Sequence, residues 1–316
     1  MKVAILILEN VLKSTAFGIE ELFYINNNFA KAKDEEKIQT EFVSFEDSKY
    51  FECKPLSYDT YYDVVIIPPT LKEHSFDIEK EIIDWLIFQH SKKAILASAC
   101  IGSFILAKTK LLDGKKATTH WAYEDMFKKE FPHIDLDVDK ILIEEKNIIT
   151  AGGINAYLDL CLYIVEKFHS NRTATQLANI MIIDRGRVSQ KSYKTFSTIF
   201  LYDDKEIKNI IEWMKENLSE QISVDLLAKK INLTEKTFTR RFKKTINSSP
   251  IQYLKSLRVE KAKELLISTS KTLGEITIEV GYFDENSFRK LFKKETSLNP
   301  IEYRNRFKQT LTQNFE

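Results

Sequence analysis

Residues 234–253 read TEKTFTRRFKKTINSSPIQY, and residues 284–303 read DENSFRKLFKKETSLNPIEY. The second stretch repeats the first at a fixed offset of 50 residues. The matching positions are Thr234 and Asp284, Thr237-Phe238 and Ser287-Phe288, Phe242-Lys243-Lys244 and Phe292-Lys293-Lys294, and Pro250-Ile251 with Tyr253 and Pro300-Ile301 with Tyr303. This number of matches at one offset indicates two copies of a short helical unit.

Each copy is preceded by another helical pattern. Residues 224–231 place Val224, Leu227, Ala228 and Ile231 on one helical face, and Asn232 can end that helix in a left-handed conformation. In the second copy, residues 273–280 form the helix, residues 281–283 the turn, and Asp284 the cap of the next helix. A helix, a tight turn and a second helix are the layout of a helix-turn-helix, so we predict an all-α domain of two such units.

The second helix of each pair has an apolar face and a basic face. Phe238 and Phe242 point inward in the first copy, and Phe288, Leu291 and Phe292 do so in the second. One basic face alone is typical of an ordinary solvated helix, but two in a tandem repeat favour DNA binding. The predicted DNA contacts are Lys236, Thr237, Thr239, Arg240 and Lys243 in the first unit, and Glu285, Asn286, Ser287, Arg289, Lys290 and Lys293 in the second.

An amphipathic stretch, residues 250–268, joins the two units. As a helix it would span roughly 25 Å. It would hold the two outward helices in successive major grooves, which lie about 34 Å apart on one face of DNA. The charge distribution agrees, because residues 205–316 carry 22 Lys and Arg against 15 Asp and Glu, although the whole chain has a net charge of only +1.

This arrangement resembles the AraC/XylS family of transcriptional regulators over about residues 206–308. The resemblance implies that the domain binds double-stranded DNA at a promoter operator, with RNA polymerase as a candidate further partner. It also implies that Lys236, Thr239 and Arg240, and Glu285, Asn286 and Arg289, read bases. The residues that carry it are Ala228, Phe242-Lys243-Lys244, Pro250 to Leu254, Leu257-Arg258, Ile276, Gly281-Tyr282, Ser287-Phe288 and Pro300 to Arg304.

A chain of 316 residues suggests about two domains. Residues 184–197 are polar and of mixed charge, which favours a solvated connection. We therefore predict a front domain over residues 1–190, a linker over 191–205 and the DNA-binding domain over 206–310.

The front domain alternates short apolar runs with helical patterns. Strand-like runs lie at 3–8, 63–67 and 94–97, and helical patterns follow at 15–27, 78–90 and 101–108. Continuous apolar strands separated by helices predict an α/β fold, a flavodoxin-like parallel sheet covered on both faces. The three cysteines are widely spaced, which predicts no disulfide framework or zinc site and a reducing, cytoplasmic environment. The apolar N-terminus is too short for a membrane span and lacks a signal-peptide cleavage pattern.

One strand-to-helix turn carries chemistry-bearing residues. Residues 98–102 read SACIG, a sharp turn that lifts the Cys100 sulfur above the sheet and points it at a helix N-terminus, where a thiolate is favoured. Cys100 is then either a reactive or ligand-contacting thiol, or a small buried residue at a tight turn. His120 is a candidate base, although a lone histidine is more often structural.

Residues 98–103, 111–114 and 118–121 resemble the ThiJ/PfpI group of the class I glutamine-amidotransferase-like superfamily, in particular the sensor branch found in GlxA-type regulators. The resemblance covers roughly residues 1–190. Enzymes of this group place a carboxylate where this chain has Thr15, and a glycine-rich oxyanion turn where it has Pro68-Pro69, which lacks N–H donors. We therefore expect a pocket that binds a small metabolite without catalysis, and the resemblance implies that this metabolite is nitrogenous. Its predicted ligand contacts are Cys100, Ile101, His120, Thr15, Pro69 and Thr70.

Three interpretations remain open at this point. The chain is a ligand-responsive, homodimeric transcription factor, or a cysteine-dependent hydrolase, amidase or glyoxalase-like enzyme with a DNA-binding tail, or a constitutive DNA-binding protein with a vestigial front domain. The first is favoured because two catalytic parts are missing. No cofactor, metal or membrane partner is predicted.

Overall fold

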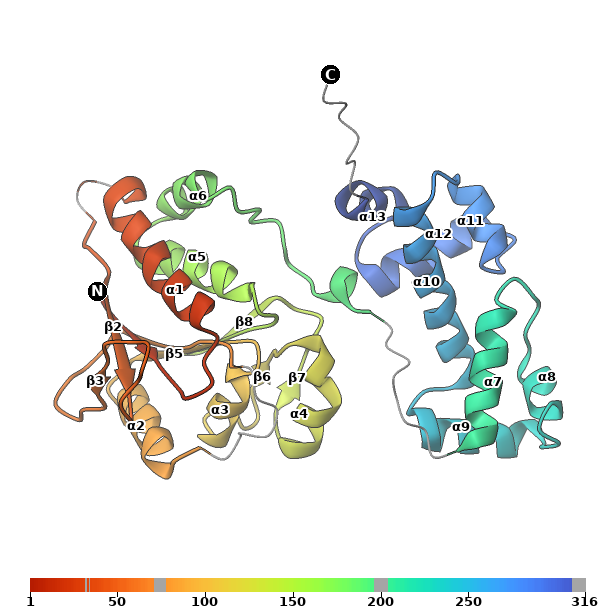
Figure 1. Ribbon diagram of the computed structural model, residues 1–316, viewed down its shortest axis with the longest axis horizontal. Helices are drawn as coiled ribbons and strands as arrows, with labels where there is room; N and C mark the ends of the chain where they lie inside the picture. Colours follow the sequence, from red (N-terminus) through yellow and green to blue (C-terminus); the bar gives the residue numbers. More distant parts are fainter. Residues whose placement is uncertain (32, 34, 71–77, 196–203, 309–316) are drawn as a thin grey trace, which may run out of the picture. The chain divides into compact units, whose positions relative to one another are not determined.

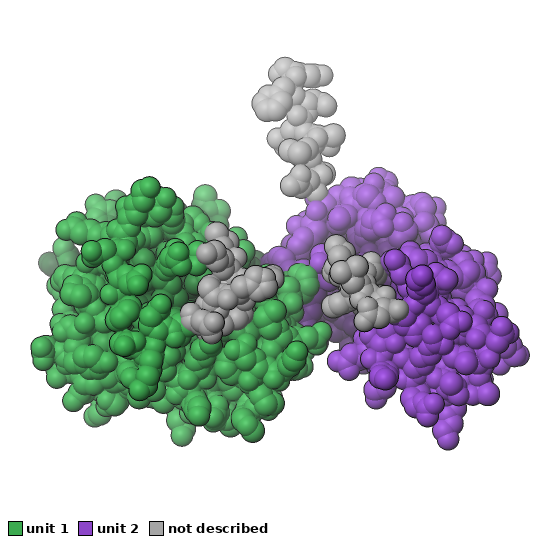
Figure 2. Space-filling view, turned by 60° about the horizontal axis from the view of Figure 1, so that its bottom comes forward, with its two compact units in different colours: residues 1–190 green, residues 191–316 purple. Residues whose placement is uncertain are grey.

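The computed structural model describes residues 1–316 except 32, 34, 71–77, 196–203 and 309–316. The chain divides into two compact units, Met1–Gln190 and Lys191–Glu316 (Figures 1 and 2). In the part of the chain that the structure describes, no helix combines the length and apolar character needed to cross a bilayer.

The first unit is built on a seven-stranded sheet in the order β3-β2-β1-β4-β5-β9-β8. All neighbouring strands are parallel except β8 and β9, which form an antiparallel pair at one edge. The predicted parallel α/β fold is confirmed. The strands are β1 (Lys2–Leu6), β2 (Gln39–Ser44), β3 (Lys54–Pro55), β4 (Val64–Ile67), β5 (Ile95–Ala99), β8 (Leu142–Glu145) and β9 (Ile148–Ala151), and β6 (Lys116–Ala117) pairs separately with β7 (Asp135–Leu136).

Helices cover both faces of this sheet (Figure 1). Alternate residues of β1 serve the two cores: Val3 and Ile5 face one layer, and Ala4 and Leu6 face the other. The first layer comprises α1 (Lys13–Ile25), the π-helical turn η1 (Asn26–Ala30), α5 (Ala156–Phe168) and α6 (Asn171–Ile180), and the second comprises α2 (Lys80–Ser91), α3 (Gly102–Lys108), the 3-10 turn η2 (Trp121–Tyr123) and α4 (Glu124–Glu130).

The second unit is helical and has two cores that share one long helix. The N-terminal part of α10 (Pro250–Ser268) contributes Tyr253, Leu254 and Leu257 to the first core, and its C-terminal part contributes Val259, Ala262, Leu265 and Leu266 to the second. The first core also contains α7 (Lys205–Glu216), α8 (Val224–Lys229) and α9 (Glu235–Ile246), and the second contains α11 (Leu273–Glu279), α12 (Glu285–Thr296) and α13 (Pro300–Phe307). The predicted pair of helix-turn-helix units is confirmed, as is the helix that joins them.

Local sequence explains where these helices begin and turn. The side chains of Thr234 and Asp284 accept hydrogen bonds from the backbone N–H groups of Thr237 and Ser287, so both predicted N-caps are confirmed. Asn232 has a φ of 54° and Gly281 a φ of 79°, the left-handed geometry that a tight turn between two helices requires.

Part of the predicted linker has structure of its own. Residues Lys191–Tyr193 form a 3-10 turn, η3, within the second unit, and α7 begins at Lys205. The Tyr193 ring packs edge-on against Phe307, with the two ring centroids 5.5 Å apart, and its hydroxyl accepts a hydrogen bond of 2.9 Å from Arg306. Linker residues 196–203, and residues 309–310 of the predicted DNA-binding domain, lie outside the described residues.

Candidate nucleic-acid interface and ligand site

Helix α9 presents the predicted basic face to solvent. Phe238 and Phe242 are fully buried on its inner side, and their rings contact each other with centroids 5.6 Å apart. Lys236, Arg240 and Lys243 are exposed on the outer side, where Thr237 and Thr239 are half-buried. A cationic surface of this kind can neutralise phosphates and offer guanidinium donors to base edges.

Helix α12 repeats this arrangement with one difference. Phe288 and Phe292 are fully buried, Leu291 packs half-buried on the same core, and Glu285 pairs with Arg289 one turn along the helix. The Glu285 carboxylate accepts bonds of 2.9 Å from Arg289 Nε and 2.5 Å from Nη2, so the exposed guanidinium is paired with a carboxylate of its own helix. The remaining predicted residues, Asn286, Ser287, Lys290 and Lys293, are exposed.

A neighbouring arginine on α9 has a structural role that the sequence did not reveal. Arg241 Nε and Nη2 donate to the Asp204 carboxylate at 2.7 and 2.8 Å, and Nη1 lies 2.6 Å from Glu206. The hydrogen bonds from Arg241 hold the pKa of Asp204 below its usual range. This fork fastens α9 to the start of α7. The equivalent position in the second helix-turn-helix unit is Leu291, so this ion pair is a feature of the first helix-turn-helix unit.

In the first unit of the chain, the turn after β5 has the sharp geometry that the sequence predicts. Cys100 adopts a φ of 56°, and its N–H donates to the Ala151 carbonyl at 2.8 Å. The turn needs glycine at position 102, because a Cβ there would approach the carbonyl oxygen of Ile67 to 2.8 Å and that of Pro68 to 3.2 Å. The end of β4 is therefore pressed against the start of α3, and this brings the 98–102 turn next to the 67–70 turn.

Cys100 does not have the chemistry expected of a thiolate. Only 4% of the residue is exposed, and burial raises the pKa of its thiol to about 11, even though the Ile101 backbone partly offsets this. The thiol is therefore protonated at neutral pH. The sequence-based expectation that the helix N-terminus would favour a thiolate is wrong here, because the desolvation of a buried charge outweighs the attraction of one helix end.

The hydroxyl groups of Ser103 and Thr119, which lie beside this turn, hold its main chain in place. Ser103 Oγ and Thr119 Oγ1 donate to the Cys100 carbonyl at 3.0 and 3.1 Å, and Ser103 Oγ also lies 2.8 Å from Thr119 Oγ1. His120 follows directly, and its Nδ1 accepts a bond of 3.1 Å from the Ala122 N–H. Burial lowers the pKa of His120, so its ring is neutral at physiological pH.

The other predicted ligand contacts lie at the entrance to α1. Thr15 is buried, and its hydroxyl donates to the Leu12 carbonyl at 2.7 Å within its own helix start. The Leu12 N–H in turn donates to the Pro69 carbonyl at 2.8 Å, and Val11 forms a β-bridge with Thr70. These contacts bring Thr15, Pro69 and Thr70 together at the carboxyl ends of β1 and β4.

A separate hollow of about 390 Å³ opens at the carboxyl ends of β1 and β2, beside the start of α2. Its lining combines apolar and aromatic side chains, such as Ile7 and Phe45, with charged side chains of both signs, such as Glu9 and Lys13. None of the six predicted ligand contacts lines this hollow. Within the described ranges, no group of three or more His, Cys, Asp or Glu side chains is arranged to hold a metal ion.

Sequence reasoning missed Gln190, the last residue of the first unit. Its side chain is 2% exposed, and its amide Nε2 donates to the carbonyls of Thr119 at 2.8 Å and Lys140 at 3.0 Å. Its Oε1 accepts from the Trp121 N–H at 3.3 Å. Gly152 is required beside it, because a Cβ there would overlap the Gln190 amide. The chain thus leaves the first unit from a residue bonded to the segment that contains His120.

Each unit contains a region that matches a known protein family. Residues 31–167 match the DJ-1/PfpI family, and residues 227–306 match the helix-turn-helix domain family.

Three curated proteins illustrate what the chain is similar to. The HTH-type transcriptional regulator GbdR of Pseudomonas aeruginosa is 25% identical over 228 residues, which cover 72% of this chain and 62% of that protein. The regulator CdhR of the same species is 24% identical over 224 residues, 71% of this chain and 66% of CdhR. Isonitrile hydratase of Pseudomonas putida is 30% identical over 121 residues, 38% of this chain and 51% of the enzyme. The chain therefore spans less than two thirds of the length of either regulator.

Proposed function

We propose that this chain, which joins a DJ-1/PfpI domain to a C-terminal AraC-type helix-turn-helix domain, is a sequence-specific DNA-binding transcriptional regulator. The observation that carries the proposal is the repetition of one exposed basic helix face, on α9 and on α12, over two separate cores joined by α10. A single basic helix is common on protein surfaces, whereas two in tandem match the successive major grooves of one DNA duplex.

The residues of the two faces divide into two roles in this proposal. Arg240 and Arg289, with Asn286, offer directed donors to base edges, and Lys243 and Lys293 offer charge to phosphates. The other predicted contacts, Lys236, Thr237, Thr239, Glu285, Ser287 and Lys290, complete the two faces.

The DJ-1/PfpI domain supplies the regulation in this proposal. It binds a small metabolite, of the nitrogenous class that the family resemblance implies, among Cys100, Ile101, His120, Thr15, Pro69 and Thr70. The protonated thiol of Cys100 and the missing N–H donors at Pro68-Pro69 support binding without catalysis. The protein acts in the cytoplasm as a homodimer, and the ligand shifts the population of dimers competent for DNA, which requires different affinities for the two states.

The test is a pull-down of sheared genomic DNA by the purified full chain at moderate salt, followed by sequencing. We expect a few promoters that share two short boxes about one helical turn apart. A variant with Lys243 and Lys293 both changed to Ala serves as the control and should recover little DNA. Sequence-blind recovery by the wild-type chain, lost equally at all sites as salt rises, would contradict a specific regulator.

The similarity to isonitrile hydratase favours a second candidate, a cysteine-dependent enzyme with a DNA-binding region. Under this alternative Cys100 acts as the nucleophile on a small isonitrile, amide or aldehyde. Assays of such substrates with wild-type and Cys100→Ala protein decide the question. Turnover that disappears in the variant would establish the enzyme, and equal background rates in both proteins would support a binding domain.

A further inference from the structure

The two helix-turn-helix units meet at a point where α10 passes from one core to the next. Leu257 belongs to the first core and Val259 to the second, so Arg258 lies at the boundary between them. Helix α10 runs through both cores and so joins the two helix-turn-helix units. The orientation of the second helix-turn-helix unit relative to the first depends, in addition, on the contacts around this boundary.

Arg258 makes contacts with both units. Its Nε and Nη2 donate to the carbonyls of Leu218 at 3.2 Å and Glu220 at 2.8 Å, in the segment between α7 and α8 of the first unit. The same guanidinium lies 5.3 Å from the ring centroid of Tyr282, in the turn of the second unit. The planar Arg258 guanidinium therefore donates hydrogen bonds to the first helix-turn-helix unit and stacks on Tyr282 of the second.

The turn of the second unit has the shape needed for this contact. Gly281 adopts a φ of 79°, which strains any residue with a side chain. A Cβ at this position would overlap the Leu218 carbonyl oxygen and would lie 2.6 Å from Arg258 Nη2. The bare Cα of Gly281 thus lets the first unit and Arg258 approach the turn that leads into α12.

We propose that Arg258, seated against Gly281, is the positioning residue that fixes α9 and α12 relative to each other and so sets the spacing between the two DNA boxes that the protein accepts. The DNA part of this inference rests on the proposed function. Adding one base pair between two boxes rotates the second by roughly 35° about the duplex axis. A rigid pair of units cannot follow this rotation, whereas a loosely joined pair can, at the cost of a lower effective concentration of the second unit.

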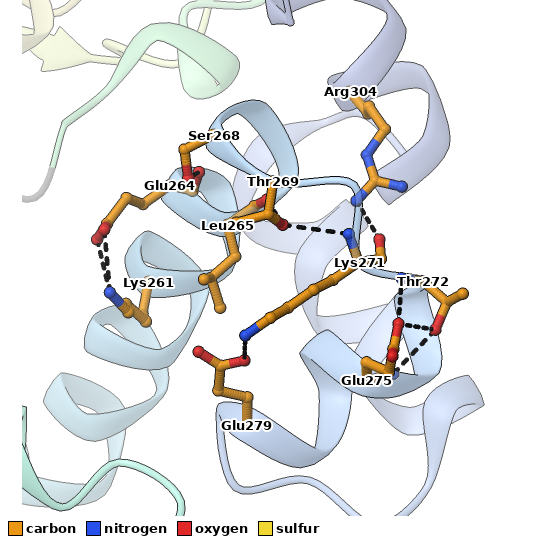
Figure 3. Close-up of polar contacts among 10 residues, drawn as sticks. All are labelled: Lys261, Glu264, Leu265, Ser268, Thr269, Lys271, Thr272, Glu275, Glu279 and Arg304. Carbon is orange, nitrogen blue, oxygen red and sulfur yellow. Dashed lines mark hydrogen bonds and ion pairs between the residues drawn. The ribbon is translucent and has the colours of Figure 1, made fainter.

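The chain offers a matched control at Arg304. This arginine also donates to two backbone carbonyls, those of Leu266 at 3.0 Å and Lys271 at 2.5 Å. Figure 3 shows it reaching the loop between α10 and α11, where Thr272 and Glu275 form a capping box. All of these groups belong to the second unit, so Arg304→Ala removes similar bonds without touching the boundary.

The first experiment measures binding of the full chain to duplexes selected from a random pool by the wild-type protein, rebuilt with spacers changed by one to three base pairs. We expect wild type and Arg304→Ala to discriminate sharply between spacers. Arg258→Ala and Gly281→Ala should lose roughly tenfold at the best spacer and retain less than about twofold discrimination, while still binding a single box. A sharp spacer profile in both boundary variants, or their loss of single-box binding, would overturn the proposal.

The second experiment needs no DNA and separates this inference from the proposed function. Spin labels at Lys244→Cys on α9 and Lys294→Cys on α12, both exposed, report the distance distribution between the two helices in a Cys53→Ser background. We expect a narrow distribution in the parent and in Arg304→Ala, and a clearly broader one in Arg258→Ala. An equally narrow distribution in Arg258→Ala would overturn the positioning role even if the protein binds DNA as proposed.

Discussion

The surroundings of Cys100 and Arg241, more than their residue types, determine what each side chain can do. Cys100 has the backbone geometry of a nucleophile turn but a buried, protonated thiol. Arg241 lies next to Arg240 in the sequence, yet its guanidinium is held by Asp204 and Glu206 and is directed at α7. Neighbours distant in sequence decide whether a cysteine is reactive or an arginine is available for DNA.

The pKa of Cys100 gives a prediction about its reactivity. Because the pKa is about 11, the thiolate fraction at pH 7 is very small and should rise about tenfold for each pH unit up to that value. Iodoacetamide labelling of Cys100 in a Cys53→Ser background, followed by peptide mass spectrometry, should show this slope with no plateau below pH 10. Free cysteine in the same samples should level off near its ordinary pKa of about 8.5. A half-maximal rate for Cys100 below pH 8 would contradict the raised pKa of its thiol.

Arg240 and Lys243 lie on the same exposed face of α9 and should behave differently. Arg240→Ala should cost about 1–3 kcal/mol on specific DNA and relax the base preference at one position, because a guanidinium can bond two acceptors of one base. Lys243→Ala should weaken all DNA similarly and flatten the salt dependence, because a lysine neutralises phosphate without reading sequence. Competition binding with specific and random duplexes across a salt series measures both effects. Equal losses on the two duplexes for Arg240→Ala would remove it from the base-reading set.

At the scale of elements, long apolar runs and strong helical patterns predicted well, while several short strands and one polar helix were missed. Strands β1, β4 and β5 were predictable because they are buried on both faces and therefore form apolar runs. The helices from α8 to α12 were predictable because each buries one face. Strand β8 was not predicted because it lies at the sheet edge, where its four residues are only half-buried and show no apolar run. Helix α6 was missed for a related reason, since its polar sequence buries only a narrow stripe.

The candidate sites also differ in how much of them the sequence predicts. The two basic faces could be predicted because a helix repeats every 3.6 residues, so the sequence shows which side chains share a face. The packing around Gln190 could not, because it depends on the fit of one amide to carbonyls 50 and 71 residues away in the sequence. Local patterns carry no information about such fits.

The contact between α7 and α9 makes the stability of the first helix-turn-helix core depend on pH. The folded-state pKa of Asp204 is lowered, so its stabilising contribution is present above the unfolded value of about 3.9 and is lost as the pH falls through the folded value. Asp204→Asn keeps a capping side chain but removes the charge. Wild type should therefore have a higher thermal midpoint than Asp204→Asn at pH 7, and the difference should shrink as the pH falls below the unfolded value and through the lowered pKa of Asp204. A difference that is unchanged at low pH would show that the ion pair is not its cause.

At the scale of the whole molecule, the two units have separate hydrophobic cores, and the chain passes from one to the other between Gln190 and Lys191. Gln190 is held by the segment beside His120, and the residues that follow it are held by the second unit. Residues 191, 193 and 194 of the predicted linker therefore form contacts with the second unit. This arrangement leads us to expect that the boundary of the DNA-binding fragment matters for its stability.

A fragment of residues 191–316 should be more stable than one of residues 204–316. The longer fragment retains Tyr193 against Phe307 and Arg306, and the Lys194 carbonyl that accepts a bond of 2.6 Å from the nearly buried Lys263. The shorter fragment loses the hydrogen bond to Lys263 and the ring contact between Tyr193 and Phe307, while Lys263 keeps its ion pair with Glu260. A difference of about 1 kcal/mol would shift the thermal midpoint by roughly 4 °C in a domain of this size. Tyr193→Ala in the longer fragment should account for part of the shift, and midpoints that coincide for all three proteins would show that η3 does not contribute to the fold.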